Sequence, residues 1–481
     1  MSKIGLQTVQ LLASVALAVG LLFFGSYPPG SGGDTPTAEA QTAPSPNIVF
    51  IVVDDMRKDD LKYMPKTQNL LEAKGKYFAN AFVSNPICCP SRATIMRGQY
   101  AHNTGVWTNF NGSNGGWEAY RTKGYEDDNV ATRLDAAGYR TALIGKYLNL
   151  YQGTSVPKGW DKWFVTPSYK FFDYDINNNG TITHYGATES AYLTDVLRRQ
   201  TQTFIDASAA QGDPFFAYVA PIAPHLPSTP APRHAHTYDG LKGPRLPSFD
   251  EVNVSDKPPW IESLPRLTAT QIASMDRHSE KRAESLQAVD DLVEGVVNRL
   301  NNAGVMRNTY IFFTSDNGYY RGEHRIPSEK YRPYEEDIRV PLLVRGPGIV
   351  AGSTTNKLAL NTDYLPTFTD LSLDAQTPSY VDGRSLKPVL DGSVTGWRDA
   401  ILLEGPQHNS VPPYRGIRTL GTNTQWKYVE YVGSSVREIY DLGVDPYERF
   451  NKSAPPAGLA TRLQALKTCA QETCRTAENG P

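Results

Sequence analysis

The chain has 481 residues, and its 48 lysine and arginine side chains nearly balance its 50 aspartate and glutamate side chains, for a formal net charge of −2. A nucleic-acid-binding protein usually carries a clear basic excess, so this balance argues against that class. Beyond the N-terminal segment, about 440 residues follow, which exceeds a typical single-core domain and predicts one large domain and a smaller one.

The N-terminal segment has the features of a secretory signal. Lys3 supplies a positive charge, Val9–Phe24 is apolar, and Ala38-Glu39-Ala40 is a candidate cleavage site after a stretch rich in Gly, Pro and Ser. We therefore interpret residues 1–40 as a signal peptide and linker, and expect a secreted protein, extracellular or periplasmic. Because the apolar stretch is shorter than the ~20 residues of a spanning helix, stable membrane insertion is not expected, with an uncleaved anchor as the alternative.

Short apolar runs alternate with helical patterns along the middle of the chain. Ile48–Val53 is a continuous, mostly β-branched run, typical of a strand buried on both faces of a parallel sheet. Further strands are predicted at Thr141–Ile144, Phe215–Val219, Tyr310–Thr314 and Val340–Val344, and helices at Glu189–Ala207, Glu280–Asn302 and Thr362–Leu371. This alternation predicts an α/β sheet with helices on both faces.

The pattern changes near residue 400. Shorter strands with turns are predicted at Trp426–Val432 and Glu438–Leu442, followed by a helix at Leu459–Thr468. We interpret residues 401–481 as a small α+β subdomain that follows a main domain of residues 41–400.

Acidic residues lie at the ends of two of the predicted strands. Asp54 and Asp55 come directly after Ile48–Val53, and Asp316 and Asn317 come one residue after the strand at Tyr310–Thr314. Open α/β sheets place their sites beyond the carboxyl ends of the strands. Three carboxylates in one pocket repel one another unless a cation compensates, and oxygen ligands favour Ca²⁺ or Mg²⁺ over zinc. The alternative is that these are ordinary turn residues at strand ends.

The four cysteines fall into two adjacent or near-adjacent pairs. Cys469 and Cys474 are spaced for one short loop and are the more plausible disulfide, because neighbouring cysteines such as Cys88 and Cys89 rarely bond to each other. Cys88 opens a predicted helix in the pentapeptide Cys88-Cys89-Pro90-Ser91-Arg92, where backbone N–H groups would face an anion. The alternative is that both are buried, unreactive thiols.

This pentapeptide resembles the signature of the type I sulfatases, in which the cysteine is oxidised to formylglycine after translation. Pro90, two residues after Cys88, sets the register, so Cys88 rather than Cys89 is the expected target. The chain as a whole is similar to this family of the alkaline phosphatase superfamily, especially to the branch of N-acetylglucosamine-6-sulfatases and extracellular heparan sulfatases. The shared stretches are Asn47–Asp55, Cys88–Asn103, Gly145–Asn149, Ala223–Pro227, Thr314–Gly318, Pro341–Gly348 and Glu438–Glu448.

The resemblance implies a fold, a cofactor and a maturation partner. It implies a large, mixed, mostly parallel sheet flanked by helices, as in alkaline phosphatase, with a smaller C-terminal α+β subdomain. It implies a metal ion, usually Ca²⁺ with Mg²⁺ possible, bound by Asp54, Asp55, Asp316 and Asn317. It also implies that a formylglycine-generating enzyme converts Cys88.

The resemblance further assigns roles to four side chains. Arg92 would steady the hydrated formylglycine, Lys146 and Lys330 would bind the sulfate group, and His225 would protonate the leaving oxygen. Many members carry a histidine two residues after the lysine that corresponds to Lys146. Leu148 stands there in this chain, which leaves the base for the hydrate unassigned.

The implied activity is hydrolysis of sulfate esters, either of sulfated sugars of the N-acetylglucosamine-6-sulfate type, as in glycosaminoglycans, or of aryl sulfates. Two alternatives stay open at this point. One is a formylglycine-dependent phosphonate or phosphodiester hydrolase of the same superfamily. The other is a non-catalytic binder of sulfated glycans whose cysteine is never modified.

Overall fold

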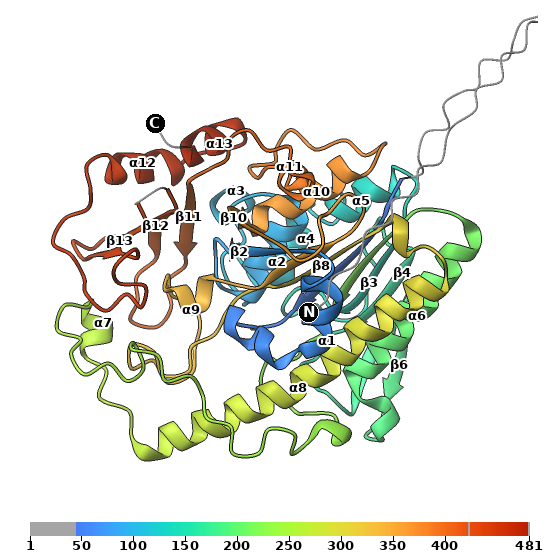
Figure 1. Ribbon diagram of the computed structural model, residues 1–481, viewed down its shortest axis with the longest axis horizontal. Helices are drawn as coiled ribbons and strands as arrows, with labels where there is room; N and C mark the ends of the chain where they lie inside the picture. Colours follow the sequence, from blue (N-terminus) through green and yellow to red (C-terminus); the bar gives the residue numbers. More distant parts are fainter. Residues whose placement is uncertain (1–44, 422–423, 480–481) are drawn as a thin grey trace, which may run out of the picture. The chain divides into compact units, whose positions relative to one another are not determined.

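The computed structural model describes residues 45–421 and 424–479 (Figure 1). The predicted signal peptide and linker, residues 1–40, lie outside the described residues. Within the described ranges, every helix is too short or too polar to cross a membrane.

Within residues 45–421, ten strands form one twisted sheet in the order β10-β2-β9-β8-β1-β7-β3-β4-β5-β6. The strands are β1 (Asn47–Val53), β2 (Lys76–Phe82), β3 (Arg140–Lys146), β4 (Lys162–Thr166), β5 (Tyr174–Asn178), β6 (Thr181–Tyr185), β7 (Phe215–Ala220), β8 (Thr309–Ser315), β9 (Leu342–Arg345) and β10 (Ser353–Leu360). The central strands β8, β1, β7, β3 and β4 are parallel, whereas β9 and the hairpin β5–β6 run antiparallel to their neighbours. The predicted mixed, mostly parallel sheet is confirmed.

Helices cover both faces of this sheet, which explains why every residue of β1 is buried. Successive side chains of a strand point to opposite faces. Ile48, Phe50 and Val52 pack into one core, and Val49, Ile51 and Val53 pack into the other. The first core includes α2 (Cys88–Arg97), α4 (Gly116–Thr122), α5 (Val130–Asp135), α10 (Tyr364–Leu371) and α11 (Lys387–Asp391), and the second includes α6 (Leu193–Gln211) and α8 (Ala269–Asn302). Each fully buried large apolar side chain contributes roughly 1.5–3 kcal/mol.

The helix α8 differs most from its prediction, because it begins at Ala269 rather than at Glu280. Thr268 and Gln271 form a capping box: each side chain accepts a hydrogen bond from the backbone N–H of the other. The first turns of α8 are mostly polar and exposed, so their apolar periodicity was too weak to reveal the start of the helix.

The C-terminal part contains a separate antiparallel sheet, as the α+β prediction required. Its strands are β11 (Ala400–Gly405), β12 (Tyr414–Thr419), β13 (Trp426–Tyr431) and β14 (Arg437–Asp441), and the helices α12 (Leu459–Leu466) and α13 (Glu472–Glu478) follow. Hydrogen bonds between main and C-terminal elements connect the two parts, and the boundary at residues 400 and 401 stays a prediction.

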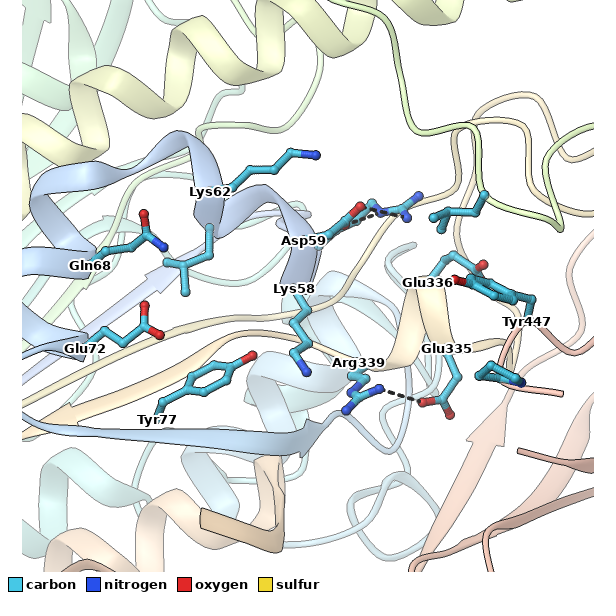
Figure 2. Close-up of a pocket in the computed structure, with 14 residues that line it drawn as sticks. Lys58, Asp59, Lys62, Gln68, Glu72, Tyr77, Glu335, Glu336, Arg339 and Tyr447 are labelled. Carbon is cyan, nitrogen blue, oxygen red and sulfur yellow. Dashed lines mark hydrogen bonds and ion pairs between the residues drawn. The ribbon is translucent and has the colours of Figure 1, made fainter. Parts of the chain in front are cut away.

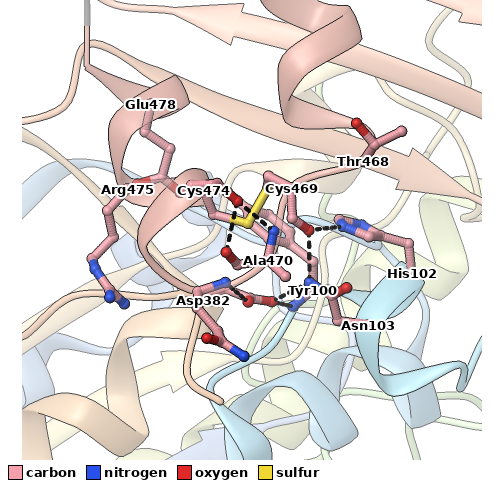
Figure 3. Close-up of a disulfide and its surroundings, with 12 residues drawn as sticks. Tyr100, His102, Asn103, Asp382, Thr468, Cys469, Ala470, Cys474, Arg475 and Glu478 are labelled. Atoms are coloured by element: carbon pink, nitrogen blue, oxygen red, sulfur yellow. Dashed lines mark hydrogen bonds between the residues drawn. A yellow bond between two sulfur atoms is a disulfide. The ribbon is translucent and has the colours of Figure 1, made fainter. Parts of the chain in front are cut away.

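The predicted disulfide between Cys469 and Cys474 is present and links the turn that follows α12 to α13 (Figure 3). The carbonyl oxygen of Cys469 accepts hydrogen bonds from Asn103 Nδ2 at 3.0 Å and lies 2.8 Å from Nε2 of His102. The disulfide loop is therefore attached to α3 (Ala101–Thr104), the short helix that follows α2.

Candidate active site

Four neighbouring parallel strands, in the order β8-β1-β7-β3, deliver most of the predicted site residues to one edge of the sheet. Val53 pairs with Ser315, so Asp54 and Asp316 are the first residues beyond two adjacent strands. The backbone N–H of Asp316 donates a hydrogen bond to the backbone carbonyl of Val53 at 3.1 Å. The carboxyl ends of β7 and β3 add His225 and Lys146 in the same way.

Cys88 lies on a helix rather than at a strand end, in the first turn of the fully buried helix α2. The N–H of Cys89 donates to the side chain of Asn109 at 2.8 Å, which fixes the start of the helix. The thiol of Cys88 donates to Oδ1 of Asp54 at 3.3 Å and lies 3.8 Å from Oδ1 of Asp55. Asn109 was not among the predicted residues, because nothing in its sequence context distinguishes it from a loop asparagine.

Three buried cations neutralise the three buried carboxylates. Lys146 Nζ lies 2.6 Å from Oδ2 of Asp54, Lys330 Nζ lies 2.6 Å from Oδ1 of Asp55, and Arg92 Nε lies 2.7 Å from Oδ2 of Asp316. Buried charges persist in folded proteins when they are paired and hydrogen-bonded in this manner. The sequence-predicted residues are thus brought together, including Lys330 from the loop beyond the acidic turn.

His225 is the most accessible of these side chains, at 23% exposure. Its Nε2 lies 3.7 Å from Oδ2 of Asp55, and its ring stacks on Tyr169 with centroids 4.8 Å apart. Tyr169 also lies under the ammonium of Lys146, at 4.9 Å, and accepts a hydrogen bond from Asn149. Tyr169 was not among the predicted catalytic or metal-binding residues, because it lies in no motif.

Burial and charge together set the protonation states in this cluster. Burial, with the charge of Asp54, raises the pKa of the Cys88 thiol, so the unmodified cysteine is a neutral thiol and a poor nucleophile. Burial would lower the pKa of Lys146, but the carboxylate of Asp54 outweighs it and the pKa is raised. Burial would raise the pKa of Asp54, but Lys146 and neighbouring cations hold it below its usual range.

The acidic residues fit a hard divalent cation. Asp54, Asp55 and Asp316 present carboxylate oxygens, and Oδ1 of Asn317 is buried without a hydrogen-bond partner among the described residues. The amide of Asn317 is oriented by its Nδ2, which donates to Asp55 at 2.7 Å and to the carbonyl of Gly318 at 2.8 Å. An oriented, unpaired amide oxygen beside three carboxylates is the donor set that Ca²⁺ or Mg²⁺ takes.

Lys330 also contacts Cys88 directly. Its Nζ lies 2.7 Å from Sγ, so a buried ammonium faces the side chain at position 88.

A second layer behind the site comes from the long helix α8. The fully buried guanidinium of Arg282 donates to the backbone carbonyls of Asp55 and Pro224, and so connects the acidic turn to the loop of His225. It also lies 3.3 Å from Oδ2 of Asp60. Sequence reasoning missed Arg282, because a single arginine in a helical pattern gives no sign that it is buried.

Two other histidines lie outside the site. His324 is fully buried against Tyr334 and lies 3.0 Å from Glu251. His102 lies 3.0 Å from Oε2 of Glu404.

A sequence profile described as Sulfatase matches residues 46–374, more than half of the chain, and one described as N-sulphoglucosamine sulphohydrolase, C-terminal, matches residues 322–467. The chain belongs to the sulfatase family. This sulfatase is therefore an enzyme.

Three relatives illustrate the range of names in the family. The sulfatase is 34% identical over 477 residues to the N-acetylglucosamine-6-sulfatase of Homo sapiens, with 90% of this chain and 86% of that protein covered. It is 32% identical over 499 residues to an arylsulfatase of Volvox carteri, covering 89% and 75%. It is 37% identical over 375 residues to an extracellular sulfatase SULF-1 homolog of Drosophila melanogaster, covering 75% and 33%.

Solved structures share the fold. One is a complex of a protein with its substrate, D-glucosamine-2-N,6-O-disulfate, at a TM-score of 0.72 and 25% identity, with 90% of this sulfatase and 98% of that chain covered. The phosphonate monoester hydrolase of Agrobacterium radiobacter has a TM-score of 0.68 at 21% identity, covering 90% and 96%. At that identity the second likeness concerns the fold alone.

Proposed function

We propose that this sulfatase hydrolyses the 6-O-sulfate ester of glucosamine-type sugar units, with aryl sulfates as a second substrate class. The observation that carries the proposal is the position of Cys88 at the start of α2, with its sulfur beside Asp54, Asp55 and Lys330. The relatives named N-acetylglucosamine-6-sulfatase and the complex with a glucosamine disulfate support the sugar class. The relative named arylsulfatase supports the second class.

Two groups complete the site in this proposal. A calcium ion, with magnesium as the alternative, would be held by Asp54, Asp55, Asp316 and Asn317 and would supply positive charge to the oxygens bound to it. A formylglycine-generating enzyme would convert Cys88, and the hydrated aldehyde would supply the hydroxyl nucleophile that a neutral thiol cannot.

The remaining roles belong to side chains already in place. Lys146 and Lys330 have raised pKa values despite their burial, because of Asp54 and Asp55 respectively, so both stay charged and can hold the oxygens of a bound sulfate group. Arg92 is fixed by its ion pair with Asp316 and its hydrogen bond to the carbonyl of Lys146.

His225 is proposed as the proton donor to the leaving oxygen. It reaches the charged cluster at Asp55 yet keeps nearly a quarter of its side chain exposed, so it lies where the leaving alcohol would depart. The stacked ring of Tyr169 restricts its orientation. A histidine is suited to this task because its ordinary pKa lies near neutrality.

Secretion, with residues 1–40 as signal and linker, belongs to the same proposal. The relatives named extracellular sulfatases support it, and so does the disulfide between Cys469 and Cys474, since such bonds persist in oxidising compartments. The division into a catalytic domain of residues 41–400 and a subdomain of residues 401–481 is likewise proposed, and the separate four-stranded sheet supports it.

The test is a substrate comparison on enzyme matured with a formylglycine-generating enzyme. The peptide that contains residue 88 should lose mass on conversion, and sulfate release from glucosamine 6-sulfate should exceed turnover of a nitrophenyl phosphodiester. Cys88→Ala should abolish activity, whereas Cys89→Ala, the matched control one residue away, should keep it. Faster cleavage of the phosphodiester would instead establish the phosphonate or phosphodiester hydrolase alternative.

A further inference from the structure

A cavity of about 510 Å³ lies between η1 (Lys58–Tyr63), η2 (Gln68–Glu72), β2 and α9 (Glu335–Ile338) (Figure 2). Its volume is within the range of small-molecule sites. Among the described residues, its lining includes none of the candidate active-site side chains. It is therefore a separate cavity that the sulfatase reaction does not explain.

Two cations line one wall of the cavity and share a single backbone acceptor. Lys58 Nζ and Arg339 Nη2 donate to the carbonyl of Ala79, at 2.9 and 2.7 Å. Figure 2 shows the ammonium of Lys58 between the ring of Tyr77 and the guanidinium of Arg339. Among the described residues, no carboxylate forms an ion pair with Lys58, and burial together with the charge of Arg339 lowers its pKa to about 8.

Arg339 is only weakly paired. Its Nη2 also donates to Oδ1 of Asn80 at 3.0 Å, and its ion pair with Glu335 is long, at 3.7 Å. Glu335 lies closer to Lys427, at 3.1 Å. Lys58 therefore has ammonium donors left for an anion, and the weakly paired Arg339 adds positive charge beside it.

The other walls carry side chains that can form hydrogen bonds with the hydroxyl groups of a ligand. The side chains of Gln68 and Glu72 form no hydrogen bond or ion pair within the described part of the chain. Glu336 is nine-tenths buried, and its Oε2 has no partner among the described residues. Burial, with the charge of Glu323, raises the pKa of Glu336 to about 8, which favours the protonated form, and a protonated carboxyl can donate a hydrogen bond.

Apolar surfaces complete the lining, from Leu61, Tyr77, Pro446 and Tyr447. A small molecule that matches this cavity has one anionic group, several hydroxyls that both donate and accept, and an apolar face for a tyrosine ring. A neutral polyol would leave Lys58 without an anionic partner, and a simple inorganic anion would leave Gln68, Glu72 and Glu336 unused.

We propose that this cavity binds a sugar unit that carries an anionic substituent, a carboxylate or a sulfate ester, with that group between Lys58 and Arg339. The proposal deepens the proposed function, because it gives the enzyme a second contact with an acidic glycan, away from the reacting ester. Binding in the cavity needs no turnover, so it can be measured on protein that lacks Cys88.

The test titrates Cys88→Ala protein with methyl glucuronide and with methyl glucoside 6-sulfate, and uses methyl glucoside as the neutral probe, by calorimetry or ligand-observed NMR. At least one anionic probe should bind tenfold more tightly than the neutral one, and the probe that does so identifies the substituent. Adding Lys58→Gln should weaken that binding at least tenfold. The matched control is Lys74→Gln, an exposed lysine two residues before β2 that does not line the cavity, and it should leave binding unchanged.

Three results would overturn the proposal: equal affinity for neutral and anionic probes, equal binding by the Lys58→Gln and Lys74→Gln proteins, or binding that Lys146→Gln removes while Lys58→Gln does not. The last result would place the probe in the active site. Lys58→Gln should also fold normally, because the carbonyl of Ala79 keeps its hydrogen bond from Arg339. A matured enzyme that lacks sulfatase activity but still binds the probe would refute the proposed function, and the proposed binding in this cavity would still hold.

Discussion

The ammonium nitrogen of Lys330 lies 2.7 Å from the sulfur of Cys88 and, on its other side, 2.6 Å from Oδ1 of Asp55. Lys330 thus touches both the residue proposed to become the nucleophile and a proposed metal ligand. We expect Lys330→Met to lower kcat/KM for 4-nitrophenyl sulfate by roughly 100- to 1,000-fold, because a preorganised charge is lost from the reacting group. Lys357→Met, at an exposed lysine of β10, is the matched control and should keep full activity.

His225 gives a prediction that depends on the leaving group. If His225 protonates the departing oxygen, His225→Gln should lower kcat/KM for a sugar sulfate by roughly 100- to 10,000-fold, because the departing alkoxide needs the proton. The same change should lower kcat/KM for 4-nitrophenyl sulfate far less, because nitrophenolate leaves without protonation. Equal losses on both substrates would assign His225 to another role. His236→Gln, at a histidine that is 82% exposed in the following loop, is the control.

Arg282 and Arg299 on the same helix provide a matched pair for stability. Arg282 is buried and bonds the carbonyls of Asp55 and Pro224, so Arg282→Met should lower the free energy of unfolding by about 3–5 kcal/mol, as expected when one member of a buried charged network is removed. Arg299 pairs with Asp206 at the surface, and Arg299→Met should cost at most about 1 kcal/mol. Urea unfolding of the two variants measures both free energies. Similar losses of stability would contradict the role of Arg282 in connecting the backbone at Asp55 and Pro224.

The unpaired oxygen of Asn317 predicts how the protein responds to calcium. A ligand that binds only the folded state at a hundredfold excess over its Kd stabilises it by about 2.7 kcal/mol. We expect calcium to raise the Tm of the unmodified protein, and Asn317→Leu to shrink that rise at the same calcium concentration. Asn356→Leu, at an exposed position of β10, should not change it. A parallel titration with magnesium identifies the preferred ion, and an unchanged calcium response in Asn317→Leu would remove Asn317 from the ligand set.

His102 predicts a dependence of stability on pH. Both ring nitrogens face acceptors, Glu404 at 3.0 Å and the carbonyl of Cys469 at 2.8 Å, and only the protonated ring donates to both. Burial would lower the pKa of His102, but the carboxylate of Glu404 outweighs it and raises the pKa above the value of the unfolded chain.

Because the pKa of His102 is raised in the folded state, its contribution to the free energy of unfolding is present at low pH. It is fully present below the unfolded pKa of about 6.5 and disappears as the pH rises through the higher folded pKa. The difference in unfolding free energy between the wild type and His102→Gln should therefore be largest near pH 6 and decline at alkaline pH. His184→Gln, at a histidine that is 60% exposed, should show a small difference throughout. A difference for His102→Gln that grows with pH would contradict the assignment.

Local patterns predicted the part of the site that lies on strand ends. Asp54 follows an unbroken apolar run, and Asp316 follows a second apolar strand that ends in Thr314 and Ser315, so their meeting at one edge of the sheet required only that the two strands be parallel neighbours. The contact of Lys330 had no such basis, because it lies in an irregular loop 242 residues beyond Cys88, and only the family resemblance singled it out. Tyr169 and Arg282 lie in no motif, and their roles depend on stacking and burial, which follow from how distant segments pack.

The sheet was predicted at its centre and missed at its margins. β1 and β8 are apolar on both faces and were recognised, whereas β10 alternates exposed and partly buried residues before its buried end and was not. Edge strands carry a weaker hydrophobic pattern because only part of their surface enters a core.

The long sequence separation between Cys88 and Lys330 also has a consequence in time. A chain made from its N-terminus at about 5–20 residues per second exposes Cys88 for roughly 12–48 s before Lys330 has been added. Until then the surroundings of the thiol are incomplete, because Lys330 is one of its direct contacts. If a formylglycine-generating enzyme converts Cys88, as proposed, the order of synthesis would give that enzyme an interval before the site is complete, and later folding would bury the finished side chain.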